Sequence, residues 1–216
     1  MSAHCGHSHD HTFDGASPAY RRRLWIVIAI NAAMFLVEMA AGALAGSMAL
    51  QADALDFLAD SATYGISLAV IGMSLRTRAW AAFGKGISLT VMGLWVLGAT
   101  AWQVFVIGVP RAEVMGIVGF LALAANLGSV LLLLPYRDGD ANVRSVWLCS
   151  RNDAIGNVAV MLAALGVWGT ATGWPDLIVA GLMAALFLSS SVQILRRSLH
   201  ELGGAPSAPA HGHHHH

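Results

Sequence analysis

Residues 24–45 read LWIVIAINAAMFLVEMAAGALA, and only Asn31 and Glu38 interrupt this apolar run. A helix needs about 20 apolar residues to cross a hydrocarbon core roughly 30 Å thick, so the run is long enough to span a membrane. A secretory signal peptide is the alternative, because basic residues precede the run. The apolar core of a signal peptide has only about 7 to 15 residues, however, and Glu38 would interrupt it. The run therefore predicts a first transmembrane helix.

Five further apolar runs follow, with short connections between them. They cover residues 48–75, 79–107, 114–134, 145–169 and 175–195. Of the 216 residues, 56% are hydrophobic and only 11% are charged, whereas about a quarter of the residues in a soluble domain are charged. Runs of this length suit helices rather than barrel strands of about ten residues. We therefore predict an all-α, polytopic protein with six transmembrane helices in direct contact with the lipid bilayer.

The basic residues predict how the helices are oriented, because Lys and Arg accumulate in cytoplasmic connections. They gather before the first run, between the second and third, between the fourth and fifth, and after the sixth, whereas the other connections hold only Arg111. Both termini are therefore expected in the cytoplasm. The 12 basic and 12 acidic residues cancel, so the composition gives no sign of a nucleic-acid partner.

Acidic residues lie inside the runs, where charge is expensive. We count five: Glu38, Asp53, Asp56, Asp60 and Asp153. A central Asp costs roughly 2.5 to 3.5 kcal/mol on insertion scales, so such residues are functional candidates. Asp53, Asp56 and Asp60 share one helical face by their spacing. Because they repel one another, these carboxylates need either protons or a cation, and a bound divalent metal would supply the missing charge. The alternative is an acidic stripe that lines water near the outer end of the helix.

The fifth run supplies a second pair, Cys149 and Asp153, which are again four residues apart. With Asp56 and Asp60 they would make four ligands, the number that a tetrahedral Zn²⁺-like ion takes. A thiolate favours softer divalent ions over Mg²⁺ and Ca²⁺. The alternative for Cys149 is a small apolar side chain in the helix packing.

Other polar side chains in the runs are candidates for auxiliary roles at such a site. They are Asp53, Glu38, Asn31, Asn152 and Asn157, although polar residues of this kind more often join helices. The depths of the two pairs differ when counted from the cytoplasmic ends, because the second-run pair lies in the outer half and the fifth-run pair in the inner half. Helix tilt, or extension of the second helix into the cytoplasm, would bring them level.

All ten His residues lie outside the apolar runs. Residues 1–20 are expected to form a mobile, His-rich tail that captures metal through His4, Cys5, His7, His9 and His11. Residues 21–197 are expected to form the transmembrane domain. Residues 198–216 are expected to form a short tail, whose final His run is either native or the remains of a purification tag.

The second and fifth runs resemble the cation diffusion facilitator family of divalent metal transporters. Residues 46–61, GSMALQADALDFLADS, are similar to the family's second-span signature, in which two ligands four apart follow a small-Ser-x-Ala-Leu segment. Cys149 and Asp153 stand where the family has its fifth-span ligand pair, although many members have His at the first position. The resemblance covers residues 21–197. It implies that Asp56, Asp60, Cys149 and Asp153 form the transport site.

The resemblance implies export of Zn²⁺ or Cd²⁺, with Co²⁺ or Ni²⁺ as further candidates, in exchange for protons. Carboxylate and thiolate ligands bind metal only when deprotonated, so protons and metal compete for one site. No prosthetic group and no enzymatic activity are expected, and the expected location is a bacterial inner membrane. The alternative is a membrane metal sensor or a passive divalent cation pore.

Family members usually continue into a cytoplasmic, ferredoxin-like domain, whereas only 19 residues follow Arg197. We therefore expect a variant without that domain, in which any homodimer forms through the transmembrane helices. Small residues allow helices to approach closely. The third run is the first candidate for this contact, because it contains Gly84, Gly86, Gly93 and Gly98.

Overall fold

A computed structural model describes residues 17–70, 73–106, 108–137 and 141–204 of the chain. Over these residues the chain forms six α-helices and one short 3₁₀-helix. They are α1 (Pro18–Ala45), α2 (Met48–Ala69), α3 (Leu75–Phe105), α4 (Ala112–Leu133), η1 (Leu134–Tyr136), α5 (Ala141–Thr170) and α6 (Trp174–Gly204). In α5 the side chains described begin at Ser150. Each predicted run corresponds to one α-helix, which confirms the all-α prediction.

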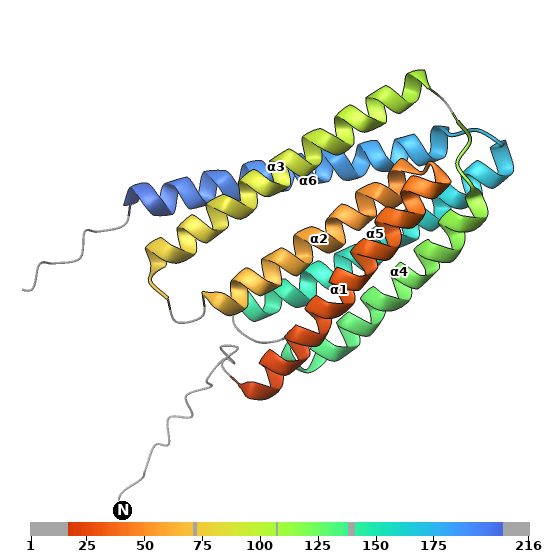
Figure 1. Cartoon of the computed structure of the whole chain (residues 1–216). Coiled ribbons are helices and arrows are strands. Elements are labelled where there is room, and N and C mark those ends of the chain that lie inside the picture. The colour runs from red at the N-terminus through yellow and green to blue at the C-terminus, as the bar shows by residue number, and fades with distance from the viewer. Residues whose placement is uncertain (1–16, 71–72, 107, 138–140, 205–216) are drawn as a thin grey trace, which may run out of the picture.

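Consecutive helices run in opposite directions, so the start of α1 and the end of α6 lie at the same end of the molecule (Figure 1). We call this the inner end, because its connections carry the basic residues, and the opposite end the outer end. Helices α3 and α6 pack along each other, as do α1 with α2 and α4 with α5. Helices α2 and α5 both contact α6 and so join the α3–α6 pair to the rest.

Helix α2 is the central element of this arrangement. It contacts α1, α3, α5 and α6, and most of its first half is buried. The other five α-helices are long and apolar enough to cross a membrane, whereas α2 is not among them. Its three Asp residues make it too polar by composition. Its neighbours, rather than its own hydropathy, keep α2 among the spans.

The connection between α1 and α2 is only two residues long. Gly46 ends α1 in the left-handed conformation, with φ of 72°, which favours glycine. Ser47 caps α2, because its Oγ accepts a hydrogen bond from the Leu50 N–H at 3.1 Å. The two helices meet closely here, since a Cβ on Gly42 would lie 2.9 Å from Cγ of Gln51. Gly42 therefore serves the close approach of the two helices, whereas Gly46 serves the turn.

Arg111, the one basic residue in the outer connections, joins two helices through hydrogen bonds. Its backbone N–H donates to the Ala45 carbonyl at 3.1 Å, and its guanidinium donates to the Leu44 carbonyl. Both carbonyls belong to the last turn of α1, where carbonyl groups lack partners within the helix. Arg111 thus ties the outer end of α1 to the start of α4.

Two glycines of α3 lie against α6 of the same chain. A Cβ on Gly86 would lie 2.8 Å from Cγ of Leu195, and one on Gly93 would lie 3.0 Å from Cγ of Leu188. Gly84 and Gly98 have open space instead. Gly86 and Gly93 therefore serve packing within the chain, which corrects their assignment to a contact with a second copy.

Candidate functional site

The acidic stripe of α2 lies inside the helix assembly. Asp53 and Asp60 are buried, and Asp56 is half-buried. The residues follow one another at intervals of three and four, so they face the same side of the helix. That side meets α5 and the α3–α6 pair, as the contacts described below show. The alternative of a stripe at the outer end of the helix applies at most to Asp53, because Asp56 and Asp60 stand mid-helix.

Asp153 of α5 lies beside the inner part of this stripe, which consists of Asp56 and Asp60. Its carboxyl group interacts with the carboxyl groups of both Asp56 and Asp60. Tyr64, one helical turn beyond Asp60, donates its hydroxyl to the Asp60 carboxylate. The same hydroxyl lies 3.3 Å from Oγ of Ser150 on α5. Carboxylates from two helices thus converge, and Tyr64 fixes the orientation of one of them.

The two pairs predicted to act together stand at similar distances along the chain from the inner ends of their helices. Asp60 stands nine residues before Ala69, where α2 ends, and Cys149 stands eight residues after Ala141, where α5 begins. The difference in depth counted from the cytoplasmic ends of the apolar runs therefore disappears when residues are counted from the helix ends. The reason is that α5 begins before the apolar run at residue 145, while α2 ends before residue 75.

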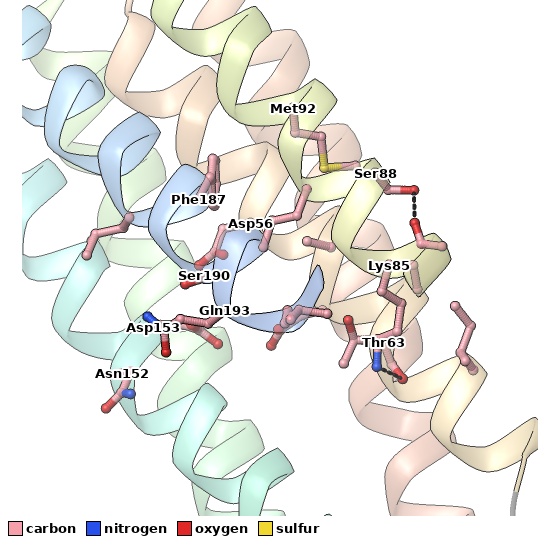
Figure 2. Close-up of a pocket in the computed structure, with 18 of the residues that line it drawn as sticks. Asp56, Thr63, Lys85, Ser88, Met92, Asn152, Asp153, Phe187, Ser190 and Gln193 are labelled. Atoms are coloured by element: carbon pink, nitrogen blue, oxygen red, sulfur yellow. Dashed lines mark hydrogen bonds between the residues drawn. The ribbon is translucent and has the colours of Figure 1, made fainter. Parts of the chain in front are cut away.

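A cavity of about 870 Å³ reaches these carboxylates. Helices α2, α3, α5 and α6 contribute its lining, and all of the lining residues except Met183 come from the inner halves of their helices or from mid-helix. Figure 2 shows side chains from these helices pointing into it, with Asp153 on one side and Lys85 on the other. Gln193 and Ser190 line it and are exposed, so the cavity reaches the molecular surface.

A second polar layer lies outward of the cavity. The Asn126 side chain donates to Oδ1 of Asn157 at 2.8 Å, and Nδ2 of Asn157 donates to Asp53 at 2.7 Å. These bonds join α4, α5 and α2 in one buried chain. Glu38 of α1 faces Asp53 and is fully buried, and neither of its carboxyl oxygens receives a hydrogen bond from the described residues. This layer does not line the cavity.

The auxiliary candidates are therefore divided between the two layers. Asn152 lines the cavity beside Asp153, whereas Asp53, Glu38 and Asn157 belong to the outer layer. Asn31 is buried, and its Oδ1 has no hydrogen-bond partner among the described residues.

Some predicted ligands lie outside the described residues. The side chain of Cys149 is one of them, as is the whole tail tract of His4, Cys5, His7, His9 and His11. Among the side chains that the structure describes, no three His, Cys, Asp or Glu residues form a group that could hold a metal ion. The described part of the predicted site consists of the three carboxylates at Asp56, Asp60 and Asp153.

Sequence analysis overlooked one buried acid, Asp176 near the start of α6. Its carboxylate accepts hydrogen bonds from Oγ of Ser47 at 2.5 Å, from the Met48 N–H at 2.7 Å and from the Ala49 N–H at 3.1 Å. Asp176 thereby caps α2 from another helix. An acid in the first turn of a helix usually stabilises its own helix, so Asp176 was not expected to act elsewhere. The sequence around Ser47 contains no pattern that indicates a partner so distant in the chain.

Carboxylates are accepted as ligands by many divalent cations, and a thiolate would favour Zn²⁺-like ions. The cavity gives access to the carboxylates of Asp56, Asp60 and Asp153. The Tyr64 and Asn157 hydrogen bonds orient carboxylates without adding positive charge.

Comparisons with known proteins agree with this chemistry. The family model described as the cation efflux transmembrane domain matches residues 24–202. The zinc transporter ZitB of Escherichia coli is 32% identical over 222 residues, which cover 93% of this chain and 69% of the relative. The metal cation efflux system protein CzcD of Cupriavidus metallidurans is 27% identical, with 91% of this chain and 65% of the relative covered.

A further relative is the cadmium, cobalt and zinc/H(+)-K(+) antiporter of Bacillus velezensis, which is 23% identical over 213 residues. These cover 91% of this chain and 66% of the antiporter. The chain thus spans about two thirds of the length of these curated relatives.

Proposed function

This chain belongs to the cation efflux transmembrane domain family, and from that premise we propose that it exports a divalent heavy-metal ion in exchange for protons. The proposed transport site consists of Asp56, Asp60, Cys149 and Asp153. The proposed location is a bacterial inner membrane, since the relatives compared above are bacterial.

One observation carries the proposal: a cavity lined mainly by the inner halves of four helices ends at the carboxylates of α2 and α5. Burial of several acids is costly unless they meet a cation, and the cavity would give a cation from the cytoplasm a path to them. The outer polar layer around Asp53 and Glu38 stands beyond the lining, so the cavity reaches the site from the inner side.

Zn²⁺ and Cd²⁺ are the proposed ions, because a thiolate at Cys149 would favour soft and borderline divalent cations. The relatives are described as transporters of zinc, of metal cations, and of cadmium, cobalt and zinc. Co²⁺ and Ni²⁺ are further candidates for the same ligand set. The similar distances of Cys149 and Asp60 from the inner ends of their helices support the inclusion of Cys149 in that set.

Protons are the proposed driving ions. Expelling a divalent cation against an inside-negative potential costs about 4.6 kcal/mol per 100 mV. Metal and protons compete for carboxylates, so entry of protons from outside displaces the metal there. One proton returns about half of the electrical cost, and two make the exchange electroneutral.

A homodimer through the transmembrane helices is also proposed. Its contact would use surfaces of α3 other than Gly86 and Gly93, because those glycines lie against α6.

Transport by the purified full chain in sealed, metal-free vesicles tests the proposal. A pH gradient should drive Zn²⁺ uptake, which an enclosed fluorescent indicator reports. Asp153→Asn should slow uptake by at least about tenfold, because loss of even an outer contact to a metal site costs 10- to 100-fold. Glu113→Gln is the matched control, because Glu113 is an exposed acid at the start of α4.

Three outcomes would contradict the proposal. Flux that ignores the pH gradient would indicate a passive pore. Zn²⁺ binding without flux would indicate a sensor. Near-normal uptake by a correctly inserted Asp153→Asn protein would remove the carboxylates of α2 and α5 from the transport site.

A further inference from the structure

Lys85 of α3 lies in the same cavity as the three carboxylates. Its side chain is half-buried, and its charge acts on the carboxylate of Asp60. Its Nζ also donates to the carbonyl of Thr63 on α2 at 3.5 Å, as Figure 2 shows. The ammonium group therefore stands at α2, within the field of a proposed metal ligand.

The choice of residue at this position is informative. Lys85 is the only lysine in the chain, and the other 11 basic residues are all arginines. An arginine clamps carboxylates with a rigid, bidentate fork, whereas a lysine is a compact charge on a flexible stem. A lysine can therefore neutralise a carboxylate and still move aside when another cation arrives.

The negative charge of the cavity makes this mobility of a lysine side chain relevant to metal binding. Asp56, Asp60 and Asp153 stand close together, and buried like charges are costly without a compensating cation. A divalent ion at these ligands would be repelled by a nearby ammonium group, since like charges within several ångströms interact strongly at the low effective dielectric constant of a protein. The metal ion and Lys85 cannot both be close to Asp60 without loss of affinity.

We propose that Lys85 competes with the transported cation for the Asp60 carboxylate. Its ammonium group interacts with Asp60 when the site is empty, and it thereby lowers the affinity of the site for metal. The inference rests on the proposed function, because it assigns Asp60 to the transport site. Lys85 would then determine specificity: an ion must bind the carboxylates strongly enough to displace an ammonium group. Lower affinity would also speed release of the ion.

The test is the Zn²⁺ affinity of the full chain in detergent, measured by competition with a fluorescent chelator. The Zn²⁺ binding that is lost in Asp153→Asn is assigned to the transport site. This difference excludes the binding contributed by the His residues of the tail. Lys85→Gln should tighten that component by about tenfold, because it removes a repulsive charge. Lys85→Arg keeps the charge and holds carboxylates more firmly, so its affinity should be no higher than that of the parent chain.

Arg78→Gln is the matched control, since it removes an exposed positive charge two turns earlier on α3 that does not line the cavity. It should change the affinity by less than about twofold, as expected for a screened surface charge. Tighter binding cannot result from damage to the fold, which would weaken the site. Unchanged or weaker binding in Lys85→Gln would overturn the inference, whereas unchanged binding in Asp153→Asn would instead overturn the proposed function.

Discussion

Asp176 shows how one side chain of α6 fixes the position of α2. Its carboxylate accepts three hydrogen bonds from Ser47, Met48 and Ala49, all in or before the first turn of α2. The group is completely buried, so water cannot replace it. Because Asp56 follows only two turns later on the same helix, the bonds at Asp176 also set where the carboxylates stand.

Replacement of Asp176 should therefore destabilise the protein strongly. Asp176→Ala leaves a buried hydroxyl and two backbone N–H groups without an acceptor, at about 1 to 3 kcal/mol for each unsatisfied group. Asp176→Asn keeps one acceptor oxygen and should show an intermediate loss. The apparent melting temperature in detergent measures the effect, with Glu113→Ala as the exposed control. Equal melting temperatures for Asp176→Ala and that control would show that the cap contributes nothing.

At the scale of the helices, α3 and α6 behave as one pair because small residues of α3 admit the side chains of α6. A leucine at Gly93 would overlap Leu188 and Phe187. Gly98 lies on the same helix in open space. The two positions therefore separate the effect of packing from the effect of helix propensity.

Gly93→Leu should lower the thermal stability, because overpacking costs about 1 to 3 kcal/mol. Gly98→Leu should be neutral or slightly stabilising, since glycine is about 1 kcal/mol less favourable than alanine within a helix. Both variants are compared with the parent chain by thermal unfolding in detergent. A larger loss for Gly98→Leu than for Gly93→Leu would mean that α3 presents a different face to α6.

The apolar runs predicted all six helices, including α2, whose three Asp residues leave it too polar to be recognised as a span by composition. They failed at two helix ends that bear on the site. Residues 70–73 continue the apolar run although α2 ends at Ala69. The first turn of α5 contains Asn142 and Arg144, so it was not recognised as part of an apolar run. Helical spacing predicted the carboxylates, whereas the contacts of Lys85 and Asp176 join residues far apart in the chain and have no local pattern.

At the scale of the whole molecule, access to the site is one-sided. The cavity separates α2 and α5 from the α3–α6 pair on the inner side, whereas Asp176 joins α6 to α2 on the outer side. The proposed transport would require that this asymmetry reverse. Under that proposal, the described conformation is the one that receives ions from the inner end.

Thiol labelling can check the direction of access. In a background with Cys5 and Cys149 changed to Ser, Ser190→Cys should react with a membrane-impermeant maleimide added from the cytoplasmic side, because Ser190 lines the cavity. Ser189→Cys is the matched control, because the side chain of Ser189 is also exposed but does not line the cavity. Faster labelling of Ser190→Cys from the opposite side would place the opening at the outer end.

The polarity of α2 also bears on how the protein is made. Three Asp residues would cost about 8 to 10 kcal/mol if α2 entered lipid alone, so a ribosome-bound chain cannot release this segment into the bilayer as an independent span. The two-residue connection at Gly46 and Ser47 supplies the remedy. Because α1 and α2 form a tight hairpin, α1 can hold α2 at the insertion machinery until the later helices arrive to enclose its carboxylates.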